Sequence, residues 1–457
     1  MTGAAGAVAT GPALDPAGPA PDPTGLTADL TGLVTDPALI RGLALMVPVA
    51  AVLAAAAVRR HSERDAAAAI LATAWNLTVL AAVNVLAAGA GWWHFAAEGA
   101  VWYGVPADLL LGWALLWGAL PALAARRAPL PLVVAALAWF DLAVMPLGRP
   151  VVVLGDGWLT GETLAVAAAL VPGLLLARWT SAGRRLRARV AMQVLLAAGA
   201  GLALPVAATQ VWRQPSWALG LLAQALAVPV LLGLAAVREF AESGRGTPLP
   251  YDPPERLVRT GPYAYVRNPM QVSMAAAYLL LAPFDRVFLA AAAVALAYGA
   301  GLAAWHEGER LGERYGAAWE EYRLAVRPWV PRPRPAVPAG APDATLHVSR
   351  VCGECSRVGD WFVRRRPAGL RILAAEDHPA GLRRIAYTAP GGGTVQGVAA
   401  VARALVNVHL GWALLGWALL LPGVTWFAQL CVDAFGGGPR AETLFAGRVP
   451  GRGGETR

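Results

Sequence analysis

A succession of long apolar runs constrains this chain more than any other feature of its sequence. Seven runs precede residue 246, and most approach the roughly 20 residues that a helix needs to cross a bilayer core. They cover residues 39–58, 67–88, 107–125, 129–147, 164–177, 190–211 and 217–237, of which 164–177 is the shortest. Hydrophobic residues make up 57% of the chain and charged residues only 15%. We therefore predict a mainly α-helical polytopic membrane protein with about seven spans.

The basic residues are concentrated in alternate loops between these runs. Arginines follow the first, third, fifth and seventh runs, whereas residues 89–106 carry none. Because positively charged loops stay in the cytoplasm, this pattern predicts a multi-pass protein of the cytoplasmic membrane with its N-terminus outside. The stretch after residue 245 is then cytoplasmic. We interpret the net charge of +9 as topology and expect no nucleic-acid partner.

Composition divides the chain into six stretches. Residues 1–37 are expected to be a disordered tail, 38–245 a helical membrane scaffold, and 246–335 a cofactor-binding region that contains a membrane hairpin at 272–282 and 287–305. A Pro/Arg linker at 336–343 leads to a small α/β unit at 344–440 and a second disordered tail at 441–457. Within that unit, residues 398–432 fit either a membrane span or a packed, interfacial helix pair.

Polar residues within the predicted spans need partners. Asn76, Asn84 and Asp141 are costly in lipid unless they face a cavity or a neighbouring helix. For Asp141, hydrogen bonding between helices is favoured over contact with a substrate.

The polar flanks of the hairpin hold the richest set of functional residues. Residues 261–270 read GPYAYVRNPM, 306–316 read HEGERLGERYG, and 327–331 read RPWVP, with Tyr322 between the last two. A hairpin returns both flanks to one membrane face, so they can build one site. This stretch resembles the isoprenylcysteine carboxyl methyltransferase family in its bacterial, phospholipid methyltransferase-like form. The resemblance implies a membrane-embedded methyltransferase that uses S-adenosylmethionine and takes a lipophilic substrate from the bilayer.

The chemistry of the residues agrees with that cofactor. Arg267 can hold the carboxylate of S-adenosylmethionine as a bidentate pair. Tyr263 or Tyr265 can stack on its adenine or face its sulfonium, and Glu307 or Glu309 can accept from its ribose hydroxyls or its ammonium. The resemblance adds Pro269 and Tyr322 as cofactor contacts, and it assigns the catalytic centre to Arg267, Asn268 and Glu309.

The unit after the linker carries a CxxC motif. Residues 344–349 alternate like a strand, 352–366 form an amphipathic helix opened by Cys352, and 370–376 and 384–390 are short strands. This arrangement resembles the DCC family of thiol-disulfide oxidoreductase-like proteins (DUF393), which implies a thioredoxin-like fold and a thiol partner protein. A helix N-terminus would make Cys352 the attacking thiolate, with Cys355 as the resolving thiol.

Two other functions remain open. Sterol reductases are similar in membrane fold, so a membrane reductase that uses NADPH is one alternative. The other is a non-catalytic membrane scaffold that presents the CxxC unit, which could itself be a binding module with a vestigial motif. We expect no metal site, because His306-Glu307 lacks a second histidine and three cysteines are too few for a four-cysteine zinc site. The methyl acceptor (isoprenoid, prenylated thiol or carboxylate, or lipid amine) is not readable from the sequence.

Overall fold

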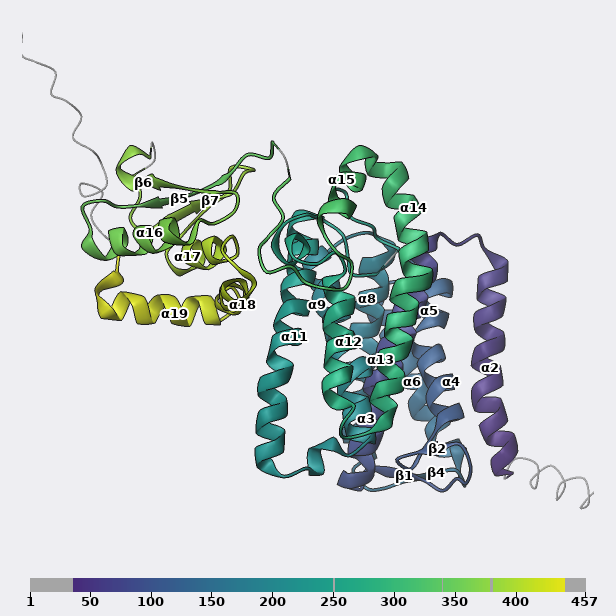
Figure 1. Cartoon of the computed structure of the whole chain (residues 1–457). Coiled ribbons are helices and arrows are strands. Elements are labelled where there is room, and N and C mark those ends of the chain that lie inside the picture. The colour runs from purple at the N-terminus through teal and green to yellow at the C-terminus, as the bar shows by residue number, and fades with distance from the viewer. Residues whose placement is uncertain (1–35, 250, 339, 379–380, 440–457) are drawn as a thin grey trace, which may run out of the picture. The chain divides into compact units, whose positions relative to one another are not determined.

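The computed structural model describes residues 36–249, 251–338, 340–378 and 381–439, without the side chains of residues 298 and 302–307. The chain is mainly helical and forms two compact units, Met1–Ala182 and Gly183–Arg457 (Figure 1). The tails predicted at 1–37 and 441–457 lie almost wholly outside the described residues. The division falls between the fifth and sixth apolar helices, so the last two of the seven belong with the loop, the hairpin and the C-terminal sheet.

The first unit is a helical bundle. Its helices are α2 (Pro37–Val58), α3 (Glu63–Ala90), α4 (Ala107–Trp117), α5 (Ala119–Ala124), α6 (Leu130–Val144), α7 (Trp158–Ala165) and α8 (Val171–Ser181). Helix α3 begins at a capping box, in which the Ser62 side chain accepts from the Asp65 backbone and the Asp65 side chain accepts in return. It packs on α4, α5 and α8 through small side chains such as Ala68, Ala69 and Ala72.

The predicted polar positions of the first unit have partners inside the bundle. The Asn76 and Asn84 side-chain amides donate to backbone oxygens one turn earlier in α3, each at 2.8 Å. Asn84 also accepts from the Trp93 indole N–H at 2.8 Å. The buried carboxyl groups of Asp141 and Glu162 face each other from α6 and α7. Asp141 therefore lies against a polar side chain of a neighbouring helix, and the hydrogen bond between helices stays a prediction.

Four short strands of the first unit were not predicted. Strand β1 (Trp93–Phe95) pairs antiparallel with β4 (Val152–Leu154), and β2 (Val101–Trp102) pairs antiparallel with β3 (Val105–Pro106). Each has at most three residues, which is too short for an alternating apolar pattern to be recognised in the sequence.

The second unit begins with helices that continue the apolar series. They are α9 (Leu186–Ala198), α10 (Leu204–Ala208), α11 (Ser216–Ser243), α12 (Pro269–Leu281), α13 (Arg286–Tyr298), α14 (Ala304–Tyr315) and α15 (Ala317–Ala325). Single π-turns join α9 to α10 (Gly199–Ala203) and α13 to α14 (Gly299–Ala303). Helix α12 packs against α11 and α13, and the Ser273 hydroxyl donates to the Pro229 carbonyl at 2.6 Å. The expected hairpin is thus present.

Seven helices of the described chain are long and apolar enough to cross a membrane. They are Pro37–Val58, Glu63–Ala90, Ala107–Ala124, Leu130–Gly148, Trp158–Ser181, Leu186–Ala208 and Ser216–Ser243. Each coincides with one predicted run. The fifth helix has 24 residues and is longer than the run predicted at 164–177. Its first turns, around Glu162, are too polar to be recognised as part of an apolar run.

The C-terminal part of the second unit holds a four-stranded sheet in the order β6-β5-β7-β8. Strand β5 (Ala344–Val348) is parallel to β6 (Leu370–Ala374) and antiparallel to β7 (Ala386–Thr388), which pairs antiparallel with β8 (Thr394–Gln396). Helices α16 (Gly353–Arg365) and α17 (Val398–Leu405) pack on it around Leu346 and Phe362. The three strands and the helix predicted here are confirmed, whereas β8 was not predicted.

Residues 398–432 do not form one straight helix. They form α17, α18 (Leu410–Leu419) and α19 (Val424–Val432), and α18 and α19 meet at 91°. Helix α18 packs against α11, where Trp417 lies in one apolar cluster with Leu232. The structure thus shows a bent helix pair in this stretch and no unbroken span, and whether the pair enters a membrane stays a prediction.

Candidate functional site

The loop before α12 and the segment after α15 are joined by backbone hydrogen bonds. The Arg267 N–H donates to the Arg327 carbonyl at 2.9 Å, and the Asn268 N–H donates to the Pro328 carbonyl at 3.2 Å. Further along, the Arg332 N–H donates to the Tyr265 carbonyl at 2.9 Å. These bonds bring the two polar flanks of the hairpin into one structure, although about 60 residues separate them in sequence.

Arg267 is partly buried and carries a charge that no acidic side chain of the described residues neutralises. Its guanidinium lies 5.6 Å from the centre of the Trp319 ring and donates one long hydrogen bond, 3.3 Å, to the Arg323 carbonyl. Burial lowers the pKa of Arg267 without removing its charge. By contrast, Arg323 itself pairs with Glu320 at 2.8 Å. Arg267 is therefore poised to accept an anionic partner.

The second nearby arginine of the loop is already paired. The Arg259 guanidinium lies 3.5 Å from the Glu321 carboxylate on α15. Because Arg259 and Arg267 belong to the same loop, this pair provides a natural control for the role of Arg267.

Two aromatic residues of the predicted site, Tyr263 and Tyr322, contact each other near Arg267. The Tyr322 hydroxyl donates to the Tyr263 carbonyl at 2.9 Å, and both side chains are buried in a cluster with Trp319. Burial raises the pKa of Tyr322, so its hydroxyl stays protonated. Pro269 is also buried and occupies the first turn of α12. These residues hold the turn in place.

Tyr265 is enclosed by the protein itself, so its ring is not accessible for the cofactor contact predicted for it. It is fully buried, its hydroxyl donates to the Val406 carbonyl at 2.7 Å, and its ring packs edge-on against Trp417 at 5.8 Å. Burial raises the pKa of Tyr265. Tyr263 and Tyr265 are two positions apart, and their rings lie in different surroundings. The sequence alone could not show that the ring of Tyr265 packs against α18.

The predicted acidic residues lie on α14. Glu309 is exposed there, and the side chain of Glu307 lies outside the described residues. No hydrogen bond or ion pair of the described chain links Glu309 to Arg267. The structure thus brings together Tyr263, Arg267, Asn268, Pro269 and Tyr322, but not Glu309.

Another acidic residue, which the sequence analysis missed, lies against the turn. Glu239 on α11 accepts from the Thr260 hydroxyl at 2.5 Å and from the Ser243 hydroxyl at 2.6 Å. Gly261 has φ +60°, and a Cβ there would lie 2.9 Å from the Glu239 side chain, so glycine permits this close approach. The only signal in the sequence was a glutamate near the end of an apolar run.

A buried ion pair fixes the start of the same loop. Arg189 of α9 donates to the Asp252 carboxylate at 2.8 Å and to the Arg184 carbonyl at 2.9 Å. Next to it, the Gln193 amide donates to the Tyr251 hydroxyl at 2.7 Å. The sequence predicted Arg189 only as a topological charge, because nothing local to it indicates a partner 63 positions away.

The CxxC motif lies at the start of α16. Cys352 is the N-cap residue, and its sulfur accepts from the Cys355 N–H at 3.3 Å. Cys352 is only 5% exposed, whereas Cys355 is more accessible. Glu376 accepts from the Ser349 hydroxyl at 2.7 Å and braces the segment before the motif. Burial alone would raise the pKa of Glu376, but hydrogen bonds to the carboxylate outweigh it and lower the pKa.

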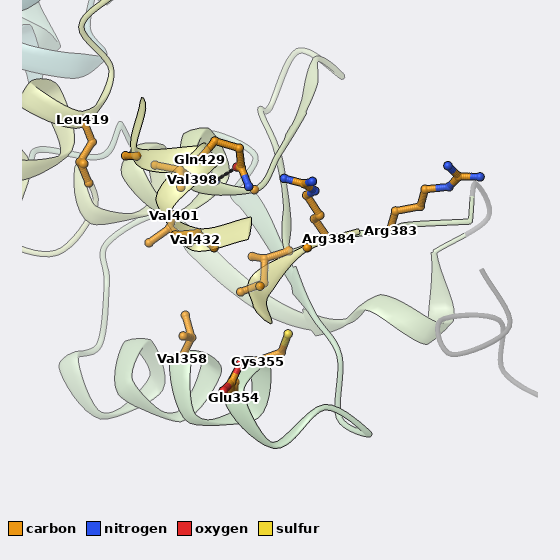
Figure 2. A pocket seen from close by; sticks show the side chains of 15 residues that line it. Glu354, Cys355, Val358, Arg383, Arg384, Val398, Val401, Leu419, Gln429 and Val432 are labelled. Carbon is orange, nitrogen blue, oxygen red and sulfur yellow. Dashed lines mark hydrogen bonds between the residues drawn. The ribbon is translucent and has the colours of Figure 1, made fainter. Parts of the chain in front are cut away.

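A cavity of about 380 Å³ adjoins this motif, and no sequence pattern predicted it. Its wall is formed by side chains of α16, α17, α18 and α19, with Cys355 on one side and Arg383 and Arg384 near the rim (Figure 2). This volume lies in the range of ~300–1,000 Å³ that is typical of small-molecule sites.

Comparisons of this chain with protein-family models, with curated proteins and with solved structures found no match. In the described part of the chain, no three His, Cys, Asp or Glu side chains lie close enough together to hold a metal ion. The function must therefore be argued from the residues of the two sites themselves.

Proposed function

We propose that this protein is an integral-membrane methyltransferase that uses S-adenosylmethionine and modifies a lipophilic acceptor. The observation that supports the proposal best is the state of Arg267. This guanidinium is partly buried in a turn fixed at both flanks, and it has no acidic partner among the described residues, while Arg259 and Arg323 do. A partly buried guanidinium without an acidic partner leaves a position that the carboxylate of a ligand can fill.

The surrounding residues fit the carboxylate end of S-adenosylmethionine. Arg267 would bind the carboxylate through charge-assisted hydrogen bonds, and Trp319 and Tyr322 would keep the guanidinium oriented. Asn268, which caps α12, has an amide that can orient the acceptor. Glu307 and Glu309 belong to the returning helix α14, and in this proposal they would accept from the ribose or the ammonium.

The reaction asks little covalent chemistry of the protein. The acceptor's lone pair forms a bond to the methyl carbon while the bond from that carbon to the sulfonium breaks, and S-adenosylhomocysteine leaves. The protein has to align three atoms and exclude water. Membrane helices beside the turn suit an isoprenoid, a prenylated thiol or carboxylate, or a lipid amine as acceptor.

Titration calorimetry on the detergent-purified protein tests this proposal. We expect micromolar binding of S-adenosylmethionine, weakened by about 10- to 100-fold in Arg267→Ala because a charge-assisted pair is lost. Arg259→Ala is the matched control and should bind as the wild type does, since Arg259 is already paired with Glu321. Binding of NADPH alone would favour a membrane reductase instead. If folded protein binds neither compound, a scaffold that presents the CxxC unit becomes the better description.

A thiol-disulfide function for the C-terminal unit is supported by a separate observation. The parallel β5-α16-β6 arrangement places Cys352 at the N-terminus of α16, where the Cys355 N–H and the helix dipole favour a thiolate, as in a thioredoxin-like fold. We expect Cys352 to act as the attacking thiol, measured as faster alkylation by iodoacetamide at neutral pH in folded than in unfolded Cys355→Ser/Cys431→Ser protein. Slower alkylation of the folded protein would favour a vestigial motif.

The membrane orientation belongs to the same proposal. We place the N-terminus outside and the Arg267 turn and the CxxC unit in the cytoplasm, because the arginine-rich loops alternate between the seven apolar helices. Protease protection of N-terminal and C-terminal epitope tags in sealed inside-out vesicles should give opposite results for the two ends. Equal protection of both tags would contradict this orientation.

A further inference from the structure

The cavity beside Cys355 has an apolar interior. Val358 of α16, Val401 of α17 and Leu419 of α18 point toward it from three helices, and Figure 2 shows the thiol of Cys355 on the α16 side. These side chains line a space of about 380 Å³ that is partly open to the surface. Its apolar lining would favour an apolar occupant, because burial of apolar surface is favourable.

Several polar groups near the cavity form hydrogen bonds and an ion pair with one another. Arg384 pairs with Asp433 at 2.9 Å, the Gln429 amide donates to Asp433 at 2.7 Å, and the Gln429 oxygen accepts from the Val398 N–H at 2.8 Å. A polar ligand would have to compete with these bonds, whereas an apolar chain leaves them intact. Arg383 and Arg384 are the basic residues among those that line the cavity.

The outer face of α19 indicates where an apolar ligand would come from. Trp426, Phe427 and Leu430 are 67%, 64% and 46% exposed, whereas Ala428 and Gln429 of the same helix line the cavity. Exposed tryptophan and phenylalanine on a short helix are typical of segments that lie at a bilayer surface. Helix α18, which precedes α19, packs on the membrane-length helix α11.

We propose that this cavity binds the aliphatic tail of an amphiphile drawn from the bilayer and holds that tail beside Cys355. The site is separate from the Arg267 turn and does not depend on methyl transfer. It would give the thiol of Cys355 a preference for long-chain partners over small polar thiol reagents.

Chain-length-dependent alkylation of a single thiol tests the site. Cys352→Ser/Cys431→Ser protein in detergent, reduced with dithiothreitol and desalted, is treated with N-ethylmaleimide or N-dodecylmaleimide, and adduct formation is followed by intact-protein mass spectrometry. Cys352→Ser/Cys355→Ser protein, which keeps only Cys431 on α19, corrects for partition of the longer reagent into micelles. We expect the dodecyl-to-ethyl rate ratio to be about tenfold or more higher at Cys355 than at Cys431, because methylene burial is favourable.

Two substitutions on one helix locate the effect. Ala428→Trp fills the cavity and should abolish the preference, while Leu430→Trp on the exposed face of α19 should keep it. An unchanged N-ethylmaleimide rate shows that each variant is folded, and Leu419→Trp fills the cavity from α18 if Ala428→Trp does not fold. Equal ratios at the two cysteines, or a preference that survives both filling variants, would overturn the proposal. So would a preference that appears only after truncation beyond Pro439, since the chain's own tail would then be the occupant.

Discussion

Removing the guanidinium of Arg189 should destabilise the second unit more than any surface substitution. Arg189 and Asp252 are 3% and 8% exposed, and their side chains meet at 2.8 Å. Loss of one partner of such a pair leaves a buried charge without this compensation, which costs about 3–5 kcal/mol. For Arg189→Met we therefore expect the melting temperature to fall by roughly 6–20 °C, at about 2–4 °C per kcal/mol.

The double variant Arg189→Met/Asp252→Leu separates this charge effect from packing. Replacing both members of a buried pair by apolar residues is often neutral or stabilising, so we expect the double variant to recover most of the loss. Tryptophan fluorescence during a thermal scan in detergent gives the melting temperature, and Arg245→Met, at an exposed pair with Glu255, is the control. A single variant that melts like the wild type, or a double variant that is no better than the single, would refute this reasoning.

Three further outcomes follow from individual contacts. Tyr322→Phe loses a buried hydrogen bond and should cost about 1 kcal/mol in thermal unfolding, whereas Leu324→Ala, 84% exposed on the same helix, should cost under about 0.5 kcal/mol; equal losses would contradict the assignment. Burial, followed by the nearby charge of His378, lowers the pKa of His347, so the stability it contributes is complete above the unfolded pKa of ~6.5 and is lost as the pH falls through the folded pKa. Melting scans at about pH 7.5 and 5.5 should show a smaller decrease for His347→Gln than for the wild type. Gly416→Leu should destabilise the packing of α18 on α17 by about 1–3 kcal/mol or more, because even a Cβ at this position would lie 2.5 Å from a backbone oxygen of α17. Hydrogen exchange of the α18 amides measures this loss, and unchanged protection of α18 would count against it.

Most of the fold could be predicted from the sequence, because its signals are local. A membrane-length helix needs only a long apolar run, and each of the seven runs became such a helix. The β5, α16 and β6 elements were readable from alternation and from the cysteine that opens the helix. The strands β1 to β4 and β8 were missed, since two or three residues carry no periodic signal.

The candidate site was predictable as a set of residues but not as an arrangement. The predicted hairpin implied that residues 261–270 and 327–331 lie close together, and the backbone hydrogen bonds of Arg267 and Asn268 confirm this. The sequence could not separate Tyr263, which packs behind the turn, from Tyr265, which is buried against α18. It also gave no reason to join Glu239 to Thr260.

What the sequence determined by itself is where the chain is apolar, where its charges lie and which elements they produce, because these depend on neighbours within one run. Only the tertiary structure decided which charges are paired. Arg189 lies in a buried ion pair, Arg259 pairs with Glu321, and Arg267 has no acidic partner among the described residues. Nothing in the sequence distinguishes these three arginines. The cavity beside Cys355 likewise exists only because α16 and the later helices α17, α18 and α19 leave space between them. Pairing and packing depend on distance in space, and a linear pattern does not encode that distance.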